Sequence, residues 1–224
     1  MEKHHDLKPD EIQARSFEII SELLPDFDQL APEWPIVRRI VHTTGDPSIT
    51  QLLRIHPMAV ESGVKALMAG RPIITDVKMV SAGISRGLAD GLGCEVLCAI
   101  DEPMVAEMAS RHRMTRSAAA ILHLSSRMAG AIVAIGNAPT ALFALLRLLE
   151  TGSSPPALVV GTPVGFVGAA ESKTALVSHT EPSTPFVTLE GTRGGSTIAV
   201  AAVNALLQLA GAEAGPNPWS RERG

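Results

Sequence analysis

The sequence predicts an α/β protein: a mostly parallel sheet with flanking helices, Gly-rich turns at the strand ends and a helical N-terminal region. From Arg71 onward, short β-branched runs alternate with stretches whose apolar residues have helical spacing. Such alternation implies parallel strands that are joined by right-handed helical crossovers. Before Arg71 the apolar residues follow helical spacing, which indicates that the first third of the chain is helical.

Three helices are expected in this first third. The first covers 9–24 and ends at Pro25, because proline cannot continue the hydrogen-bonding pattern of a helix. The second begins near Ala31 and ends at the Gly-Asp-Pro turn 45–47. The third covers 57–69 and is followed by a glycine.

Five units of strand and helix are expected after it. The strand runs are 72–77, 94–100, 131–137, 157–166 and 185–191, and the helical runs that follow them are 81–93, a long polar helix through Arg116 and beyond, 138–150, 167–177 and 192–210. The last three units share one plan, in which a strand of buried character leads into a Gly-rich turn and then a helix.

The Gly-rich turns predict where a ligand binds. They are GNAPT at 136–140, GTPVG at 161–165 and GTRGGS at 191–196. In open parallel sheets, ligands bind beyond the carboxyl ends of the strands, where backbone N–H groups and helix dipoles favour anions. None of the turns matches G-x-G-x-x-G or a P-loop, and no acidic partner for a ribose stands nearby. We therefore expect a ligand with several carboxylates or phosphates rather than a dinucleotide.

Length and composition exclude several classes of protein. The chain has 224 residues, of which 46% are hydrophobic, enough for a full core. We expect one domain over 1–210 and a flexible tail over 211–224, whose composition is typical of turns. Lysine and arginine total 19 against 23 acidic residues, and aromatic residues make up only 3%. This composition argues against a partner that is a nucleic acid.

The sequence also predicts a cytoplasmic protein without membrane contact. No apolar segment of a secretory signal is found near the start, and the apolar run 128–149 is interrupted by Asn137, Pro139 and Arg147. Cys94 and Cys98 lie in an expected strand, too far apart for a disulfide, and are interpreted as small buried hydrophobic residues. No metal-binding spacing is found, and no metal is expected.

His42 is the strongest candidate for acid–base chemistry. It ends an apolar helix and opens the turn HTTGDP, where its side chain could face a cavity. A histidine near a helix C-terminus is favoured in its protonated form. Arg39 lies three residues earlier, on nearly the same face of the helix. From position alone, a role in capping the helix stays open for His42.

The other candidates are less specific. Ser16 stands inside the first helix, where a serine usually bonds back to its own helix or faces solvent. Ser85 follows Gly83 in an expected loop after a strand, and Arg116 begins a stretch of small residues that would admit a flat ligand. Lys173 could be an ordinary solvated charge of a helix. These residues describe a mostly apolar cavity with an anion-binding rim, but they do not name a reaction.

Several phrases of the sequence together resemble one known family. They are RSFEII around Ser16, IVRRIVHTTGD around His42, TRSAAA at 115–120, GNAPTAL at 136–142, PVGFVGAAESK at 163–173 and GGS at 194–196. On these motifs the chain resembles the precorrin-8X methylmutases of cobalamin biosynthesis, from about Ile12 to about Leu209. GNAPTAL and PVGFVGAAESK are long and unusual, so the resemblance is specific.

The resemblance implies an isomerase with an α/β fold and a homodimer. Such enzymes move a methyl group between adjacent carbons of one ring of precorrin-8, in a formal 1,5-sigmatropic shift that gives hydrogenobyrinate. The cobalt-containing substrate gives cobyrinate, and no separate cofactor is used, because the methyl group is already on the substrate.

The resemblance also implies roles for individual residues. His42 matches the family's proton donor and acceptor, and Ser16 and Arg39 match positions that contact the substrate. Ser85 and Arg116 are expected to line the same site. Asn137, which stands in GNAPTAL, and Lys173, which ends PVGFVGAAESK, are also predicted to bind the substrate.

Chemical reasoning agrees with these roles. Protonation of a ring nitrogen makes the conjugated macrocycle electron-poor, which lowers the barrier to migration of the methyl group. The proton must then return, and histidine suits such an exchange near neutral pH. The peripheral carboxylates need cations and N–H donors. A tetrapyrrole carrier without catalysis remains the alternative, and an enzyme for phosphorylated small molecules is disfavoured by the missing phosphate-binding fingerprint.

Overall fold

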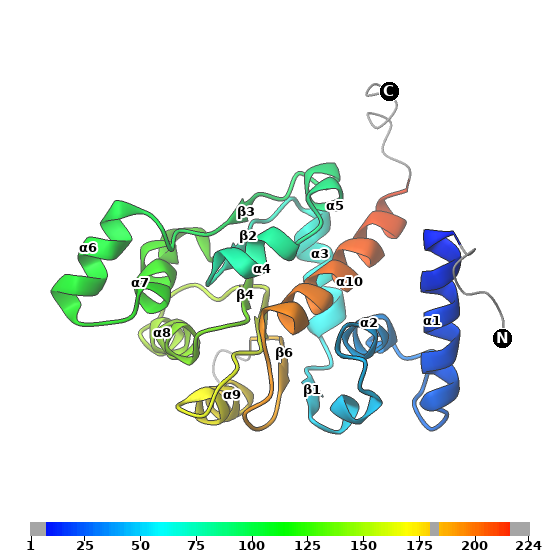
Figure 1. Cartoon of the computed structure of the whole chain (residues 1–224). Coiled ribbons are helices and arrows are strands. Elements are labelled where there is room, and N and C mark those ends of the chain that lie inside the picture. Colours follow the sequence, from blue (N-terminus) through cyan, green and yellow to red (C-terminus); the bar gives the residue numbers. More distant parts are fainter. Residues whose placement is uncertain (1–7, 180–183, 216–224) are drawn as a thin grey trace.

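The chain folds around a six-stranded sheet that is parallel except for one edge strand. The computed structural model describes residues 8–179 and 184–215 (Figure 1). The strand order is β1-β6-β5-β4-β2-β3, and β1 pairs with β6 in antiparallel orientation. The strands are β1 (Leu53–Ile55), β2 (Ile73–Thr75), β3 (Val96–Leu97), β4 (Ile132–Ile135), β5 (Leu158–Gly161) and β6 (Phe186–Leu189).

Helices cover both faces of the sheet. On one face lie α2, α3, α4, α5 and α10, with α1 packed against α2, and on the other face lie α7, α8 and α9. The helices are α1 (Pro9–Leu23), α2 (Trp34–Thr44), α3 (Ala59–Met68), α4 (Lys78–Gly83), α5 (Arg86–Gly91), α6 (Pro103–His112), α7 (Arg116–His123), α8 (Pro139–Glu150), α9 (Ala169–Ser178) and α10 (Ser196–Ala214), with the 3₁₀ turns η2 (Pro47–Gln51) and η3 (Ser125–Arg127). This is the predicted α/β architecture.

The central strands are apolar on both sides, as parallel strands between two helical layers should be. In β4, Ile132 and Ala134 face the core under α10, while Val133 and Ile135 face the core under α8. All four side chains are fully buried. The predicted strand runs after the first third therefore give the sheet its two hydrophobic cores.

Helix α10 is the central helix of its layer and lies against α2, α3, α4 and α5 (Figure 1). Among the described residues it is long and apolar enough to cross a membrane by length and composition alone. Its apolar side chains instead form much of the larger core, and a core helix passes the same test. Small alanines at 199, 201, 202 and 205 allow the neighbouring helices to approach it closely.

The three expected N-terminal helices are found with small shifts at their ends. The first ends at Leu23, and the second begins at Trp34 rather than near Ala31. The third is α3, which begins two residues later than expected. The sequence reasoning missed β1, a three-residue edge strand that lies between these helices and pairs with β6. A strand this short gives too little alternation to be recognised.

Three local predictions were wrong. The long helix through Arg116 is two helices, because Arg113 has a φ of 51° and ends α6, and Thr115 then caps α7. The expected helix 81–93 is divided into α4 and α5, so Ser85 stands at the N-cap of a helix and not in a loop after a strand. The expected strand 94–100 is regular only at β3.

The predicted tail begins too early. The segment from Gly211 to Ala214 is the last turn of α10. Residues 216–224, and with them most of the predicted flexible tail, lie outside the described residues.

Candidate active site

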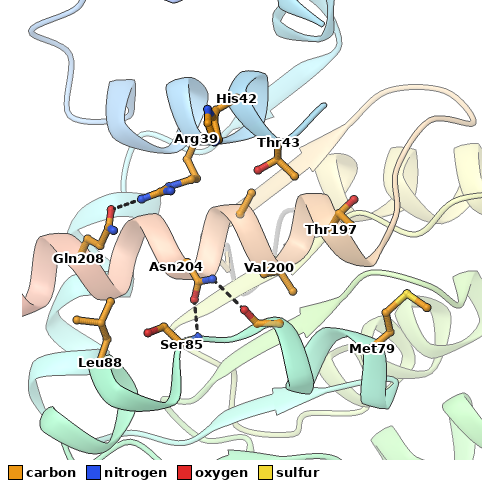
Figure 2. A pocket seen from close by; sticks show the side chains of 12 residues that line it. Arg39, His42, Thr43, Met79, Ser85, Leu88, Thr197, Val200, Asn204 and Gln208 are labelled. Carbon is orange, nitrogen blue, oxygen red and sulfur yellow. Dashed lines mark hydrogen bonds between the residues drawn. The ribbon is translucent and has the colours of Figure 1, made fainter. Parts of the chain in front are cut away.

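Two cavities meet at His42, in the last turn of α2. The first, of about 410 Å³, lies where α10 passes between α2 and the α4–α5 segment (Figure 2). The second, also of about 410 Å³, lies between α1 and the end of α2. The first cavity is lined by side chains that include Arg39, His42, Thr43, Met79, Ser85, Leu88, Thr197, Val200, Asn204 and Gln208. His42 is thus accessible from two sides.

The His42 ring is fixed by contacts with α1. Its Nδ1 atom lies 2.8 Å from the Ser16 hydroxyl, and its ring meets the Phe17 ring edge to face at 5.5 Å between centroids. Gly45, with a φ of 64°, ends α2 and donates its N–H to the Val41 carbonyl. Within the described residues Nε2 has no hydrogen bond, so this nitrogen is available to a bound molecule.

Arg39 brings a positive charge to the same cavity. Its guanidinium donates to the side-chain oxygen of Gln208 at 2.7 Å (Figure 2). It also donates to the side-chain oxygen of Gln13 at 3.4 Å and lies 5.3 Å from the centre of the Phe17 ring. Burial lowers the pKa of the Arg39 guanidinium below its ordinary value. Both partners are neutral amides, so the charge of Arg39 is not cancelled there. The guanidinium of Arg38 also lies over the Phe17 ring, 4.1 Å from its centroid.

Ser85 is held at the opposite wall by α10. The Asn204 side chain accepts the Ser85 N–H at 2.9 Å and donates to the Gly83 carbonyl at 3.0 Å (Figure 2). A Cβ atom on Gly83 would lie 2.7 Å from the Val200 side chain, so glycine permits this close approach. The Ser85 side chain thereby lines the first cavity with Arg39 and His42.

Sequence reasoning missed the polar residues that α10 adds to this cavity, Thr197, Asn204 and Gln208. A signal for them was present. They lie seven and four residues apart, on one face of a helix that is otherwise nearly all apolar. A polar stripe on the central helix of a layer indicates a cavity.

The Gly-rich turns converge as expected, but their N–H groups serve the fold. Gly195 donates to the Thr162 carbonyl at 2.8 Å, and Gly165 donates to the Thr192 carbonyl at 3.2 Å. The turns after β5 and β6 are therefore bonded to each other. At these positions the expected supply of free donors for a ligand's carboxylates is not found.

The turn after β4 is also occupied. The N–H groups of residues 136–138 all donate to the carboxylate of Asp76, which directly follows β2, at 2.8 to 3.1 Å. Asp76 is fully buried, and burial raises its pKa above the ordinary 3.8, while the three N–H bonds act in the opposite direction. This anion belongs to the protein itself and fills the turn that was expected to bind a ligand.

Three predicted residues lie outside the two cavities. Arg116 is exposed at the start of α7, and Asn137 is exposed in the turn after β4. Lys173 is only 1% exposed, and its ammonium donates to the backbone carbonyl of Arg193. The described residues thus bring Ser16, Arg39, His42 and Ser85 together, and leave the other three apart.

Across the described ranges, no group of three or more His, Cys, Asp or Glu side chains could hold a metal ion. Cys94 is buried, and burial raises the pKa of its thiol to about 11. Both cysteines are free, but Cys98 is only half-buried, so the prediction of a buried residue holds for Cys94 alone.

Fold and site together define an α/β protein with an accessible histidine between an apolar cavity and an arginine. Residues 11–209 match the sequence profile of the precorrin-8X methylmutases. The chain belongs to this family of isomerases in cobalamin biosynthesis.

Individual relatives agree with the family. The chain is 39% identical to a cobalt-precorrin-8 methylmutase of Priestia megaterium over 204 residues, which cover 91% of this chain and 89% of that protein. It is 43% identical to a precorrin-8X methylmutase of a Sinorhizobium species, over 87% of this chain and 92% of that protein. The solved precorrin-8X methylmutase of Thermus thermophilus superimposes with a TM-score of 0.81 at 38% identity, covering 92% of this chain and 99% of that chain.

Proposed function

We propose that His42 is the proton donor and acceptor for the methyl shift on precorrin-8 or its cobalt-containing counterpart. The observation that carries this proposal is the junction of the two cavities at His42, with Arg39 one turn before it. The bond between Ser16 and Nδ1 holds the ring, and Nε2 is left for the substrate. The carrier alternative gives no reason for an accessible histidine held in this way.

The chemistry needs one proton and no external methyl donor. His42 protonates a ring nitrogen of the substrate, and the methyl group then moves to the adjacent carbon, so that one carbon–carbon bond breaks as another forms. The proton returns to His42 when the product's conjugation is restored. Histidine suits both transfers because its ordinary pKa lies near neutral pH.

Substrate binding is proposed to use charge on one side and apolar surface on the other. Arg39 would pair with a peripheral carboxylate, and Ser16 and Ser85 would donate hydrogen bonds. Arg116 and Asn137 stay predictions as substrate contacts, supported by their exposure and not by proximity to His42. The predicted contact of Lys173 with substrate has no support in its burial.

A homodimer in the cytoplasm is also proposed. The dimer is supported by the apolar surface that a single copy leaves exposed, which includes the adjacent Phe166 at 93% and Val167 at 90%. Light scattering coupled to gel filtration, at several protein concentrations, would test it, and a monomer throughout would refute it.

The function is tested by visible spectra of the protein with precorrin-8 and, separately, with cobalt-precorrin-8. Wild type should convert one of them, and His42→Ala should bind the same substrate while turnover falls by about 10²- to 10⁴-fold. His112→Ala, at an exposed position of α6, is the matched control and should keep full activity.

Other outcomes would overturn the proposal. Binding without conversion of either substrate by wild type would support the carrier. Equal losses of binding and turnover in His42→Ala would make His42 a structural cap of α2.

A further inference from the structure

Lys173 is a buried cation whose contacts indicate a structural role and not a contact with the substrate. It lies on α9, 1% exposed, and its ammonium donates to the Arg193 carbonyl at 2.5 Å. No carboxylate is paired with it among the described residues, and burial lowers its pKa to about 8. A desolvated ammonium is costly to keep, so its contact with the Arg193 carbonyl requires a physical explanation.

That carbonyl belongs to a loop with little freedom. The loop between β6 and α10 is tied to the turn after β5 by the bond from Gly195 to Thr162. Gly194 fits so tightly that a Cβ there would lie 2.4 Å from the carbonyl oxygens of Thr162 and Pro163. The ammonium of Lys173 adds a third anchor, which fixes the backbone at Arg193 from the interior side.

The side chain of Arg193 connects this loop to the segment after His42. Its guanidinium donates to the carboxylate of Asp46 at 2.8 Å. Asp46 lies four residues after His42, at the N-cap of η2, where it also accepts the N–H and hydroxyl of Ser48. The bonds from Ser48 and then from Arg193 lower the pKa of Asp46.

We propose that Lys173 is a positioning residue, which acts through the Arg193 backbone and the Arg193–Asp46 ion pair to hold the turn after α2 and thereby His42. The path consists of the hydrogen bond from Lys173 to the Arg193 carbonyl, the ion pair between Arg193 and Asp46, and the short turn that joins Asp46 to His42. It joins the interior of the sheet's second helical layer to the end of the helix that carries His42. The proposal rests on the proposed function only in the role that it gives to His42.

The experiment compares single and double variants in two measurements. Lys173→Met removes the ammonium and keeps the length of the side chain, and Asp46→Asn removes the charge at the other end of the path. Lys173→Gln keeps an N–H donor and serves as the conservative variant. Lys65→Met and Arg127→Gln are controls, because each breaks an exposed ion pair on another part of the surface.

The first measurement uses free protein and needs no substrate. It follows the imidazole ¹H–¹³C cross-peak of His42, assigned by its loss in His42→Gln. This peak should move in Lys173→Met and in Asp46→Asn, move less in Lys173→Gln, and stay in place in both controls. An unmoved peak in Asp46→Asn, where Lys173 is intact and the change is at the surface, overturns the proposal even if Lys173→Met does not fold.

The second measurement is steady-state kinetics with the converted substrate. Each single variant should lower kcat by about 10-fold with KM changed by less than about 2-fold, since a small displacement of a catalytic group costs rate more than binding. The double variant should be no slower than the slower single variant, because both changes break one path. If the fold-losses of kcat in the two single variants multiply in the double variant, or if the variants raise KM without lowering kcat, a shared path is refuted.

A failure of the proposed function can be distinguished from a failure of the positioning role of Lys173. If wild type converts neither substrate, the proposed function fails, while the His42 cross-peak still decides whether Lys173 and Asp46 are coupled to that ring.

Discussion

Replacing Asp76 by asparagine should destabilise the fold by about 2 to 4 kcal/mol. The carboxylate accepts the Gly136 N–H at Oδ1 and the N–H groups of residues 137 and 138 at Oδ2. An amide has one acceptor oxygen, which can replace Oδ2 and keep two of the three bonds. Its NH₂ group then faces the Gly136 N–H, so two buried donors lose their partners.

The magnitude follows from these contacts. Each buried donor without a partner costs about 1 to 3 kcal/mol, and the two remaining bonds lose the strength that a charged acceptor gives. Burial of the charged carboxylate has a desolvation cost, which is why the pKa of Asp76 is raised. The neutral asparagine does not have this cost, and its absence offsets part of the lost stability. A domain with the usual stability of about 5 to 15 kcal/mol stays folded after such a change.

Urea unfolding at neutral pH, followed by circular dichroism, measures this difference. The midpoint should fall while the slope m stays unchanged, because the folded state exposes no new surface. Asp90→Asn is the matched control, since it makes the same chemical change at an exposed residue of α5, and its stability should stay within about 0.5 kcal/mol of wild type. Equal stabilities of Asp76→Asn and Asp90→Asn would refute the three-bond account of Asp76.

Two further predictions concern charge. Arg39→Ala should weaken substrate binding by about 10- to 100-fold with a larger effect at low salt, as for the loss of a charge-assisted contact. Absorbance titrations at two ionic strengths test this, and an unchanged affinity would remove Arg39 from the site. For Lys173, the folded-state pKa of about 8 lies below the ordinary 10.5, so the unfolded chain holds the proton to higher pH. The group's contribution to stability therefore rises with pH, and the stability of wild type relative to Lys173→Met should grow by about 1 to 2 kcal/mol from about pH 7.5 to 9.5. A constant difference would contradict the lowered pKa.

The architecture was predictable because long patterns encode it. The runs that became β4, β5 and β6 are almost completely buried, and each is followed by a glycine-containing turn and a helix. The features that sequence reasoning missed are a very short strand and a helix end that depends on the backbone conformation of one residue. Arg113 ends α6 with a left-handed backbone conformation, which in most sequences is indicated by a glycine. Strand β1 has only three residues. A single sequence carries little signal for such features.

The site was predictable in part. The resemblance predicted that Ser16 and His42 belong to one site. Their hydrogen bond was not predicted, because the two residues are 26 positions apart and their spacing shows no contact. Asn204 was missed because its partners, the Ser85 N–H and the Gly83 carbonyl, are more than a hundred residues away in the chain. Lys173 was interpreted as a solvated or ligand-binding charge because a sequence does not reveal that a lysine on α9 faces inward.

The location of the site on the helices follows from Asp76. Strand β2 leads outward to β3, while β4 leads to β5 on the other side, so the sheet changes direction between β2 and β4. In open α/β sheets the crevice at this point is where ligands bind. Here Asp76 at the end of β2 accepts the N–H groups of residues 136–138 at the end of β4, so the protein supplies its own anion. With that crevice filled, the cavity forms one layer away on α10, where Gln208 bonds Arg39 and Asn204 bonds the Ser85 segment on the opposite wall (Figure 2). A cavity walled by helix faces offers a broad apolar surface with charge at its edge, which suits a large flat macrocycle better than the narrow turn of a nucleotide site.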